Sequence, residues 1–245
     1  MSHNKKHAPR VVPHRAWNVN KGFIGEPETG KSTVASALAA DYARSCYVLA
    51  HDLNFSIPDK LPTGRELEVH RHLLPEQAGA SLSRPETSRG IHAIASSDAG
   101  EVIDLAYRVS LANLGGQKVP LNEELTRYHW TGTTRTEAVP VVVYVDELVN
   151  AIDATPYRLG DVAKDLLSQR RHRHVGLIWT TQSPRLVHYQ FVSLCTSLVL
   201  FRVSQEDDLK ALAKAGVPRE ILQQLPGLPL HHFIEWRKSG IVYDL

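Results

Sequence analysis

Several kinds of residue are scarce in this chain of 245 residues. It has only two cysteines, Cys46 and Cys195, each inside an apolar run. This excludes a disulfide framework and a cysteine-rich metal site and predicts two buried thiols in a reducing compartment. No run approaches the roughly 20 apolar residues that a membrane-spanning helix needs, and the first residues lack the apolar segment of a signal peptide. We therefore expect no membrane span and a cytoplasmic protein.

An excess of charge of one sign is also missing. Lys and Arg number 28 against 26 Asp and Glu, so the formal net charge is +2, and any binding of nucleic acid must come from a local patch. The 13 histidines show no Cys or carboxylate spacing that is typical of zinc ligation. The length suits one α/β domain and leaves little room for a second.

The most informative segment is Gly25–Ser32, with the sequence GEPETGKS. It matches the phosphate-loop pattern G-x-x-x-x-G-K-[ST], in which glycines let successive backbone N–H groups point at phosphate oxygens at the start of a helix. A short strand over 17–24 and an Ala-rich helix over 32–42 supply the context that the motif requires. We expect the side chains of Glu26 and Glu28 to point away from the phosphates. The predicted nucleotide-binding residues are Gly25, Glu26, Pro27, Glu28, Thr29, Gly30, Lys31, Ser32 and Thr33.

A second motif follows about 115 residues later. The nearly continuous β-branched run over 139–145 is typical of a buried parallel strand, and it ends in Asp146 and Glu147. At the carboxyl edge of a sheet, Asp146 would hold Mg²⁺ through water together with Ser32, and Glu147 would act as general base on the attacking water. Lys31 would reach the β- and γ-phosphates of bound ATP.

Two further elements complete the candidate site. Thr155-Pro156 predicts the start of a helix whose buried face is Leu159, Val162, Ala163, Leu166 and Leu167. This helix ends in the cluster Gln169-Arg170-Arg171-His172-Arg173-His174, a candidate source of an arginine finger that acts on a neighbouring subunit. The strand over 175–181 then ends at Gln182, which we expect beside the γ-phosphate.

The remaining chain alternates regular and irregular segments. Strands are expected over 45–50, 90–95 and 198–201, a helix from the cap Ser97 to about Leu114, a helix that begins with the capping-box pattern of Ser204 to Asp207, and a terminal hairpin. Residues 1–15 are expected to form a flexible basic arm before a single domain over 16–245, with irregular insertions at about 53–89 and 115–138. In the second insertion, Lys118, Arg127 and Arg135 alternate with aromatic residues, which suits either nucleic-acid contacts or a solvated loop.

The order of these motifs resembles the FtsK–HerA group of DNA-pumping ATPases. The resemblance rests on the phosphate loop, the strand that ends Val-Asp-Glu, the arginine segment, and the strand that ends Thr-Thr-Gln-Ser-Pro. It implies a P-loop NTPase fold of the RecA/ASCE kind, with a mostly parallel central sheet flanked by helices and a C-terminal β-hairpin. A stand-alone motor of this size is similar to the genome-packaging ATPases of tailless, membrane-containing viruses with double-jelly-roll capsids.

The resemblance also implies a function. The chain would hydrolyse ATP with Mg²⁺, assemble as a homo-oligomeric ring, expected to be a hexamer, and drive double-stranded DNA into a preformed capsid at a vertex built from other capsid proteins. It would work in the host cytoplasm or on the virion at that vertex. The implied catalytic residues are Lys31, Glu147 and Gln182, with Arg170, Arg171 or Arg173 as the finger and Arg158 behind them.

Two other functions fit the phosphate loop. A small-molecule or nucleoside kinase would share it. A kinase also needs a protein carboxylate that binds the substrate near the second strand, and the pair His51-Asp52 could be that group. Against a kinase, the adjacent Asp146 and Glu147 and the strand tip at Gln182 suit activation of water. An assembly ATPase that binds nucleotide without moving DNA would have the same motifs, and DNA binding that weakens steeply with salt would distinguish the two.

Overall fold

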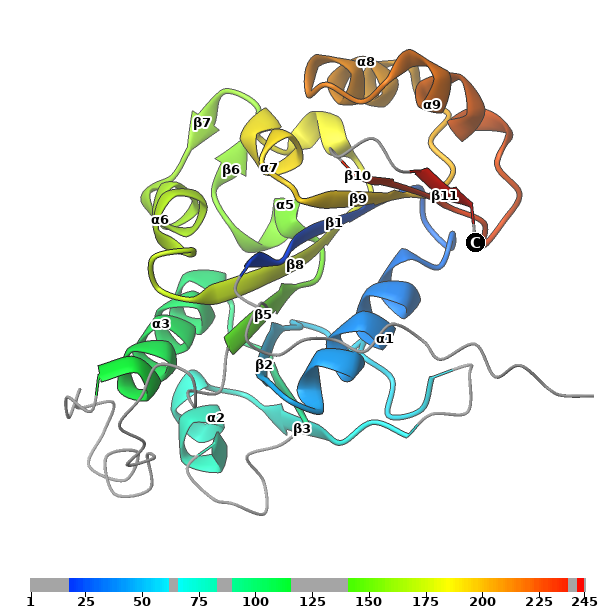
Figure 1. The fold of residues 1–245 in the computed structure, drawn as a ribbon. Coiled ribbons are helices and arrows are strands. Elements are labelled where there is room, and N and C mark those ends of the chain that lie inside the picture. The colour runs from blue at the N-terminus through cyan, green and yellow to red at the C-terminus, as the bar shows by residue number, and fades with distance from the viewer. Residues whose placement is uncertain (1–17, 62–65, 83–89, 116–140, 238–241, 245) are drawn as a thin grey trace, which may run out of the picture.

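A single mixed sheet organises the chain. The computed structural model describes residues 18–61, 66–82, 90–115, 141–237 and 242–244, and within them nine strands form one sheet in the order β11-β10-β9-β1-β8-β5-β2-β4-β3 (Figure 1). The strands are β1 (Asn20–Ile24), β2 (Tyr47–His51), β3 (Val69–His72), β4 (Ile91–Ile94), β5 (Val141–Val145), β8 (Val175–Thr181), β9 (Ser197–Leu200), β10 (Ile234–Arg237) and β11 (Val242–Asp244). All neighbours from β9 to β3 are parallel, whereas β10 and β11 form an antiparallel hairpin. The predicted mostly parallel sheet with a C-terminal hairpin is confirmed.

Helices cover both faces of the sheet. The α-helices are α1 (Lys31–Ala43), α2 (Pro75–Leu82), α3 (Ala99–Gly115), α5 (Leu148–Ala151), α6 (Asp161–Gln169), α7 (Tyr189–Ser193), α8 (Glu206–Lys214) and α9 (Arg219–Gln224). Buried residues of α1 share one core cluster with Val142 and Tyr144 of β5. Val141, Val143 and Val145 belong to the other cluster, with α3, α6 and α7. Alternate side chains of one strand thus enter opposite cores, as a central strand between two helical layers requires.

The strand register brings the three predicted motifs to one edge. Ile24 of β1 is level with Thr181 of β8, and Val145 of β5 is level with Trp179 of β8. Because parallel strands end at the same side of a sheet, the residues that follow β1, β5 and β8 meet at its carboxyl edge, where α/β folds bind ligands. The site predicted from sequence therefore lies at this edge.

Part of the expected irregular insertion over 53–89 is regular, which corrects that prediction. Val69–His72 forms the edge strand β3, parallel to β4, and Pro75–Leu82 forms α2. The strand has little apolar character, so its pairing with β4 and not its own pattern decides its structure. The predicted arm over 1–15 and the segment 116–138, with Lys118, Arg127 and Arg135, lie outside the described residues.

Two predicted helix starts were also wrong. Thr155-Pro156 does not open a helix but lies in a small hairpin of β6 (Ala154–Thr155) and β7 (Arg158–Leu159). The Gly160 N–H donates to Asp153 O (2.6 Å), which closes the hairpin, so α6 begins only at Asp161. Within α6, Ala163 and Leu166 are buried as expected, whereas Val162 is exposed. At α3, Asp98 takes the capping role expected of Ser97, because its Oδ1 accepts from the Gly100 N–H.

In the part of the chain that the structure describes, no helix is long and apolar enough to cross a bilayer.

Candidate functional site

The phosphate loop joins β1 to α1 through strained and crowded backbone. Gly30 has φ of 93°, a left-handed conformation that glycine adopts without penalty. A Cβ on Gly25 would lie 2.5 Å from the Cβ of Phe201, so only glycine fits there. The Thr29 hydroxyl donates to Glu26 O (2.7 Å) across the loop. The loop is thus preshaped, with the N-terminus of α1 at its end, as binding of an anion requires.

Lys31 is the first residue of α1 and is only 6% exposed. Burial lowers the pKa of its ammonium group, and the nearby charges of Glu147 and then Asp146 oppose this shift. A buried cation without a bonded partner of its own is costly. The two carboxylates compensate the charge in part, and a polyphosphate would compensate it further.

Asp146, directly after β5, collects hydroxyl groups from four elements. Its Oδ1 accepts from Ser32 Oγ (3.1 Å), Tyr144 OH (3.1 Å) and Thr180 Oγ1 (2.8 Å), and its Oδ2 lies 3.1 Å from Ser56 Oγ. The phenol of Tyr144 is fully buried, and burial is the largest reason why its pKa is raised well above the ordinary value. Tyr144 therefore remains a hydrogen-bond donor. The carboxylate is held between phosphate loop and sheet.

These groups fit a magnesium ion. Mg²⁺ prefers hard oxygen ligands and usually binds through one or two side chains, several waters and substrate phosphates. Ser32 Oγ and the Asp146 carboxylate, placed together beside the phosphate loop, are such a set. No group of three or more His, Cys, Asp or Glu suited to a metal occurs among the described residues. A bound Mg²⁺ ion would neutralise charge that develops on the phosphates.

Glu147 lies beside Asp146 on a tight turn. It has φ of 50°, unusual for a residue with a side chain, and its N–H donates to Thr180 Oγ1 (2.8 Å). Its Oε1 accepts from Thr181 Oγ1 (3.1 Å) and from the Gln182 N–H (3.2 Å). Strain of this kind is common at functional sites. The tip of β8 therefore sets the position of the predicted general base.

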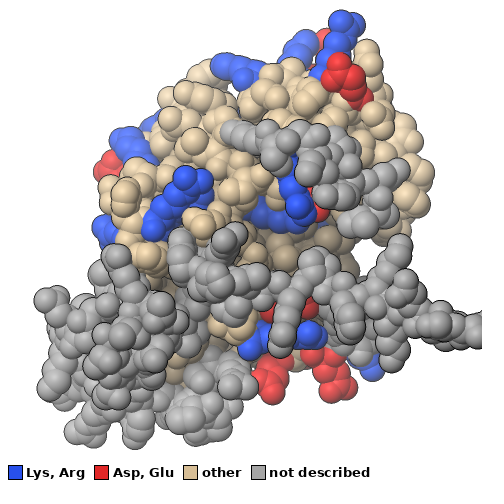
Figure 2. Space-filling model, in the orientation of Figure 1, with Lys and Arg blue, Asp and Glu red and all other residues tan. Residues whose placement is uncertain are grey.

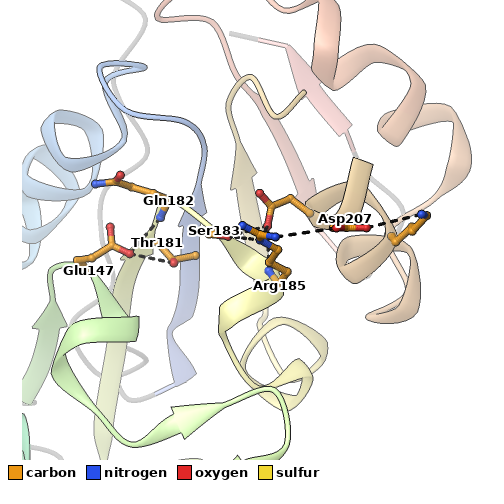
Figure 3. A network of polar contacts seen from close by, with 8 residues as sticks. Glu147, Thr181, Gln182, Ser183, Arg185 and Asp207 are labelled. Carbon is orange, nitrogen blue, oxygen red and sulfur yellow. Dashed lines mark hydrogen bonds and ion pairs between the residues drawn. The ribbon is translucent and has the colours of Figure 1, made fainter. Parts of the chain in front are cut away.

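Gln182 is exposed at the end of β8, next to Glu147 (Figure 3). Residues 183–185 then contact α8, where Ser183 Oγ and the Arg185 N–H both donate to Asp208 Oδ1 (2.8 and 3.1 Å). The structure thus brings Lys31, Glu147 and Gln182 to one edge of the sheet, as the sequence predicts.

Glu26 turns its carboxylate toward the segment that follows β9, as expected for a side chain that avoids the phosphates. It accepts from Arg202 Nε (3.1 Å), the Ser204 N–H (2.8 Å) and the Ser204 hydroxyl. These bonds, the Ser204 hydroxyl first, lower the pKa of Glu26. The predicted capping box of α8 is therefore wrong, because Gln205 precedes the helix and Ser204 holds the phosphate loop instead.

Sequence reasoning missed part of the pocket wall. A cavity of about 540 Å³ opens over residues 28–34 and is also lined by Phe201 and His231. His231 has φ of 67°, and its Nδ1 would lie 3.2 Å from a Cβ on Gly30. These two residues come from the end of β9 and from the segment before β10, and nothing in their local sequence indicates a ligand. The volume of the cavity lies within the range of small-molecule sites.

The arginine cluster lies at the amino end of β8, opposite the phosphate loop. Arg170 is 3% exposed and donates to Val19 O (3.0 Å), and burial lowers its pKa to about 10. Arg173 stacks on Tyr107 and lies 3.5 Å from Asp165. Only Arg171 of the three is exposed. Burial removes Arg170 from the candidate fingers.

The visible charge is dispersed. On the face shown in Figure 2, the described Lys and Arg residues stand in separate groups, several with acidic residues beside them. No continuous basic field covers the described residues of this face, which agrees with the net charge of +2.

The comparisons with known proteins identify the fold. No protein-family model and no curated protein matches the sequence. Among solved structures, the genome packaging NTPase B204 from Sulfolobus turreted icosahedral virus 2, in complex with AMPPCP, superposes with a TM-score of 0.62 over 93% of this chain and 96% of that chain, at 12% identity. B204 of Sulfolobus Turreted Icosahedral Virus, described as a DNA-packaging ATPase, gives 0.58 over 91% and 94%, at 15% identity.

VirB4 of Thermoanaerobacter pseudethanolicus is similar at a TM-score of 0.51 over 92% of this chain and 88% of that chain, with 14% identity. The chain has a P-loop ATPase fold. At these identities the likeness concerns the fold, and it confirms at that level the resemblance to FtsK–HerA packaging ATPases.

Proposed function

We propose that this chain is an ATPase that moves double-stranded DNA into a viral capsid as part of a ring. The observation that carries the proposal is the convergence of Lys31, Ser32, Asp146 and Glu147 at one sheet edge, in a fold that matches a genome-packaging NTPase over nearly its whole length. A bound triphosphate with Mg²⁺ would then contact the loop N–H groups, Lys31 and Ser32.

Each side chain has a separate chemical task. Lys31 would place a positive charge on the β- and γ-phosphates. Glu147, which follows β5, would accept the proton of the attacking water. Gln182, whose N–H donates to Glu147 Oε1 at the tip of β8, would orient that water. The product of this arrangement is ADP and phosphate, with no acceptor molecule required.

A kinase is disfavoured by the state of Asp52. Its carboxylate is 1% exposed and accepts from the Ile57 N–H (2.9 Å) and the Ser56 N–H (2.8 Å). A third bond comes from Ser56 Oγ (2.8 Å). The buried carboxylate thus stabilises the turn after β2, so the feature that suggested a kinase has a structural role.

A ring also gives the arginine cluster a function. β8 has seven residues, about 23 Å of extended chain, so Arg171 lies far from its own phosphate loop. A head-to-tail ring joins two different surfaces of each subunit, and we propose that the amino edge of one sheet meets the carboxyl edge of the next subunit's sheet. Arg171 is then the candidate finger, and Arg158 is exposed in the β6–β7 hairpin.

The deciding experiment measures ATP hydrolysis with and without double-stranded DNA while light scattering follows the oligomeric state. Strong stimulation by DNA together with a ring supports a packaging motor. Turnover that ignores DNA in a ring indicates the assembly ATPase, and a monomer that phosphorylates a small molecule indicates the kinase. The DNA affinity of a motor should also fall with salt, with a log–log slope of about −0.9 per phosphate neutralised.

A further inference from the structure

Asp208 is a buried carboxylate to which the proposed mechanism gives no role. It lies in the first turn of α8, is 5% exposed, and accepts at Oδ1 from Ser183 Oγ (2.8 Å) and the Arg185 N–H (3.1 Å). The Arg185 Nε lies 3.8 Å from the same oxygen. Its neighbour Asp207 is 67% exposed and reaches Arg185 only at 3.9 Å.

The chain that Asp208 holds is the continuation of the β8 tip. Thr181 and Gln182 bond to Glu147, and Ser183 and Arg185 bond to Asp208. The turn is therefore bonded at one end to the predicted base and at its other end to α8. Any shift of residues 183–185 would move the two groups that determine where Glu147 stands.

The segment from Arg202 to Asp208 also holds the phosphate loop. Arg202 and Ser204 bond to Glu26, and the Glu26 N–H donates to Arg202 O (3.0 Å). Residues 202–208 thus contact the phosphate loop at one end and the β8 tip at the other. We call the three residues that make these contacts, Arg202, Ser204 and Asp208, the brace.

The energetics favour a positional role for this carboxylate. The Arg185–Asp208 ion pair contributes little net stability, because Arg185 is half exposed to water and Asp208 loses its hydration on burial. In-line attack of water on a phosphate depends on spacing, and an error of about 1 Å can lower the rate on the order of 10²-fold. Asp208 bonds to the residues that directly follow Gln182, so its contacts affect the distance between Glu147 and the phosphate loop.

We propose that Asp208 is a positioning residue for hydrolysis. Through Ser183 and Arg185 it fixes Gln182 and Glu147 at a set distance from the phosphate loop, whose other side the brace holds through Glu26. The proposal rests on the proposed ATPase function. It adds that α8, outside the phosphate-binding motifs, controls the rate of the chemical step.

The test compares adjacent residues on one helix. Asp208→Ala removes the acceptor, Asp208→Asn retains a neutral one, and Asp207→Ala is the matched control. We expect kcat for ATP to fall by about 10- to 100-fold in Asp208→Ala, with partial recovery in Asp208→Asn and a change of less than about twofold in Asp207→Ala. KM and the Kd of a fluorescent ATP analogue should stay within about threefold, since the phosphate loop is retained.

Other outcomes are decisive too. If Asp208→Ala does not fold, Ser183→Ala removes one arm of the same contact and should lower kcat in the same selective way. Unchanged kcat in both variants, or kcat that falls only together with nucleotide affinity, overturns the positioning role. If the unmodified protein hydrolyses no ATP, the proposed function fails first; if it hydrolyses ATP and Asp208→Ala is equally active, only the brace proposal fails.

Discussion

Ser32 Oγ lies 3.1 Å from Asp146 Oδ1, which joins the start of α1 to the end of β5 across 114 positions of sequence. The contact unites the two halves of the nucleotide motif in one place. Thr180 and Tyr144 bond to the same oxygen and hold the carboxylate from the sheet side. The orientation of Asp146 is thus determined before any ligand binds.

This arrangement predicts the effect of Asp146→Asn. The substitution retains the shape but removes the charge that would hold Mg²⁺ through its water shell, and losses of about 10- to 100-fold are usual for such contacts. The Kd of a fluorescent ATP analogue, titrated with Mg²⁺, should rise by that factor. With EDTA present, the variant and the unmodified protein should bind equally. A variant that keeps its full Mg²⁺ dependence contradicts the assignment.

The general base is tested by Glu147→Gln. An amide cannot accept the proton of water, so kcat should fall by about 10²- to 10⁴-fold, while nucleotide binding persists because Lys31 and the loop are intact. Glu76→Gln, at an exposed position of α2 outside the site, is the control and should keep its turnover. Substantial hydrolysis by Glu147→Gln would show that another group activates the water.

The buried Lys31 should make the affinity for nucleotide depend on pH. Burial lowers the pKa of its ammonium group from 10.5, and a triphosphate favours the protonated form. Nucleotide affinity should therefore be highest below the lowered pKa of Lys31 and fall as pH rises through it. This decline should begin at a lower pH than the titration of an ordinary lysine. Isothermal titration across this range checks the prediction. Lys31→Arg, which stays protonated, should bind without that alkaline decline, and identical pH profiles would refute the explanation.

His72 on the edge strand β3 should make the folded protein less stable in acid. The ring of His72 packs near His92, with Nε2 and Nδ1 3.2 Å apart, and burial, then the charge of His70, lowers the pKa of His72 from 6.5 to about 4. The unfolded chain binds a proton at a higher pH than the folded chain does. The contribution of neutral His72 to the free energy of unfolding is thus complete above pH 6.5 and is lost as pH falls toward about 4.

Urea unfolding at two pH values tests this contribution. His72→Gln should lose less free energy of unfolding between neutral and acidic pH than the unmodified protein does. His172→Gln, at an exposed position, is the control and should behave like the unmodified protein. An equal acid sensitivity of all three proteins would place the titrating group elsewhere.

Local patterns predicted the sheet well. They also predicted that Asp146 and Gln182 follow strands at its carboxyl edge, because buried strands that end in polar residues are typical of parallel sheets. Individual hydrogen bonds decided what was missed: the Asp153 carbonyl closes the hairpin that delays α6, and Glu26, 178 positions away in sequence, draws Ser204 away from a cap. Asp208 looked like one more acid in a polar helix start, since burial of a single carboxylate leaves no pattern in sequence.

Arg170 and Arg171 are neighbours in sequence with opposite environments, and this difference gives the last prediction. Arg170→Ala removes a buried guanidinium and leaves the Val19 carbonyl without that donor, so the thermal midpoint should fall. Arg171→Ala changes an exposed residue, and its stability should be unchanged. If Arg171 acts on a neighbouring subunit, its loss should lower DNA-stimulated turnover by about 10³-fold or more in rings made only of the variant.

Mixed rings separate a finger from an ordinary surface residue. When Arg171→Ala subunits are titrated into unmodified protein, each variant subunit should inactivate the site of its neighbour and leave its own loop able to bind ATP. Two variants that are each inactive alone, Arg171→Ala and Glu147→Gln, should therefore regain activity when mixed, because a Glu147→Gln subunit supplies Arg171 to the intact site of an Arg171→Ala neighbour. Mixed rings that are no more active than either variant alone would show that Arg171 does not act across the interface.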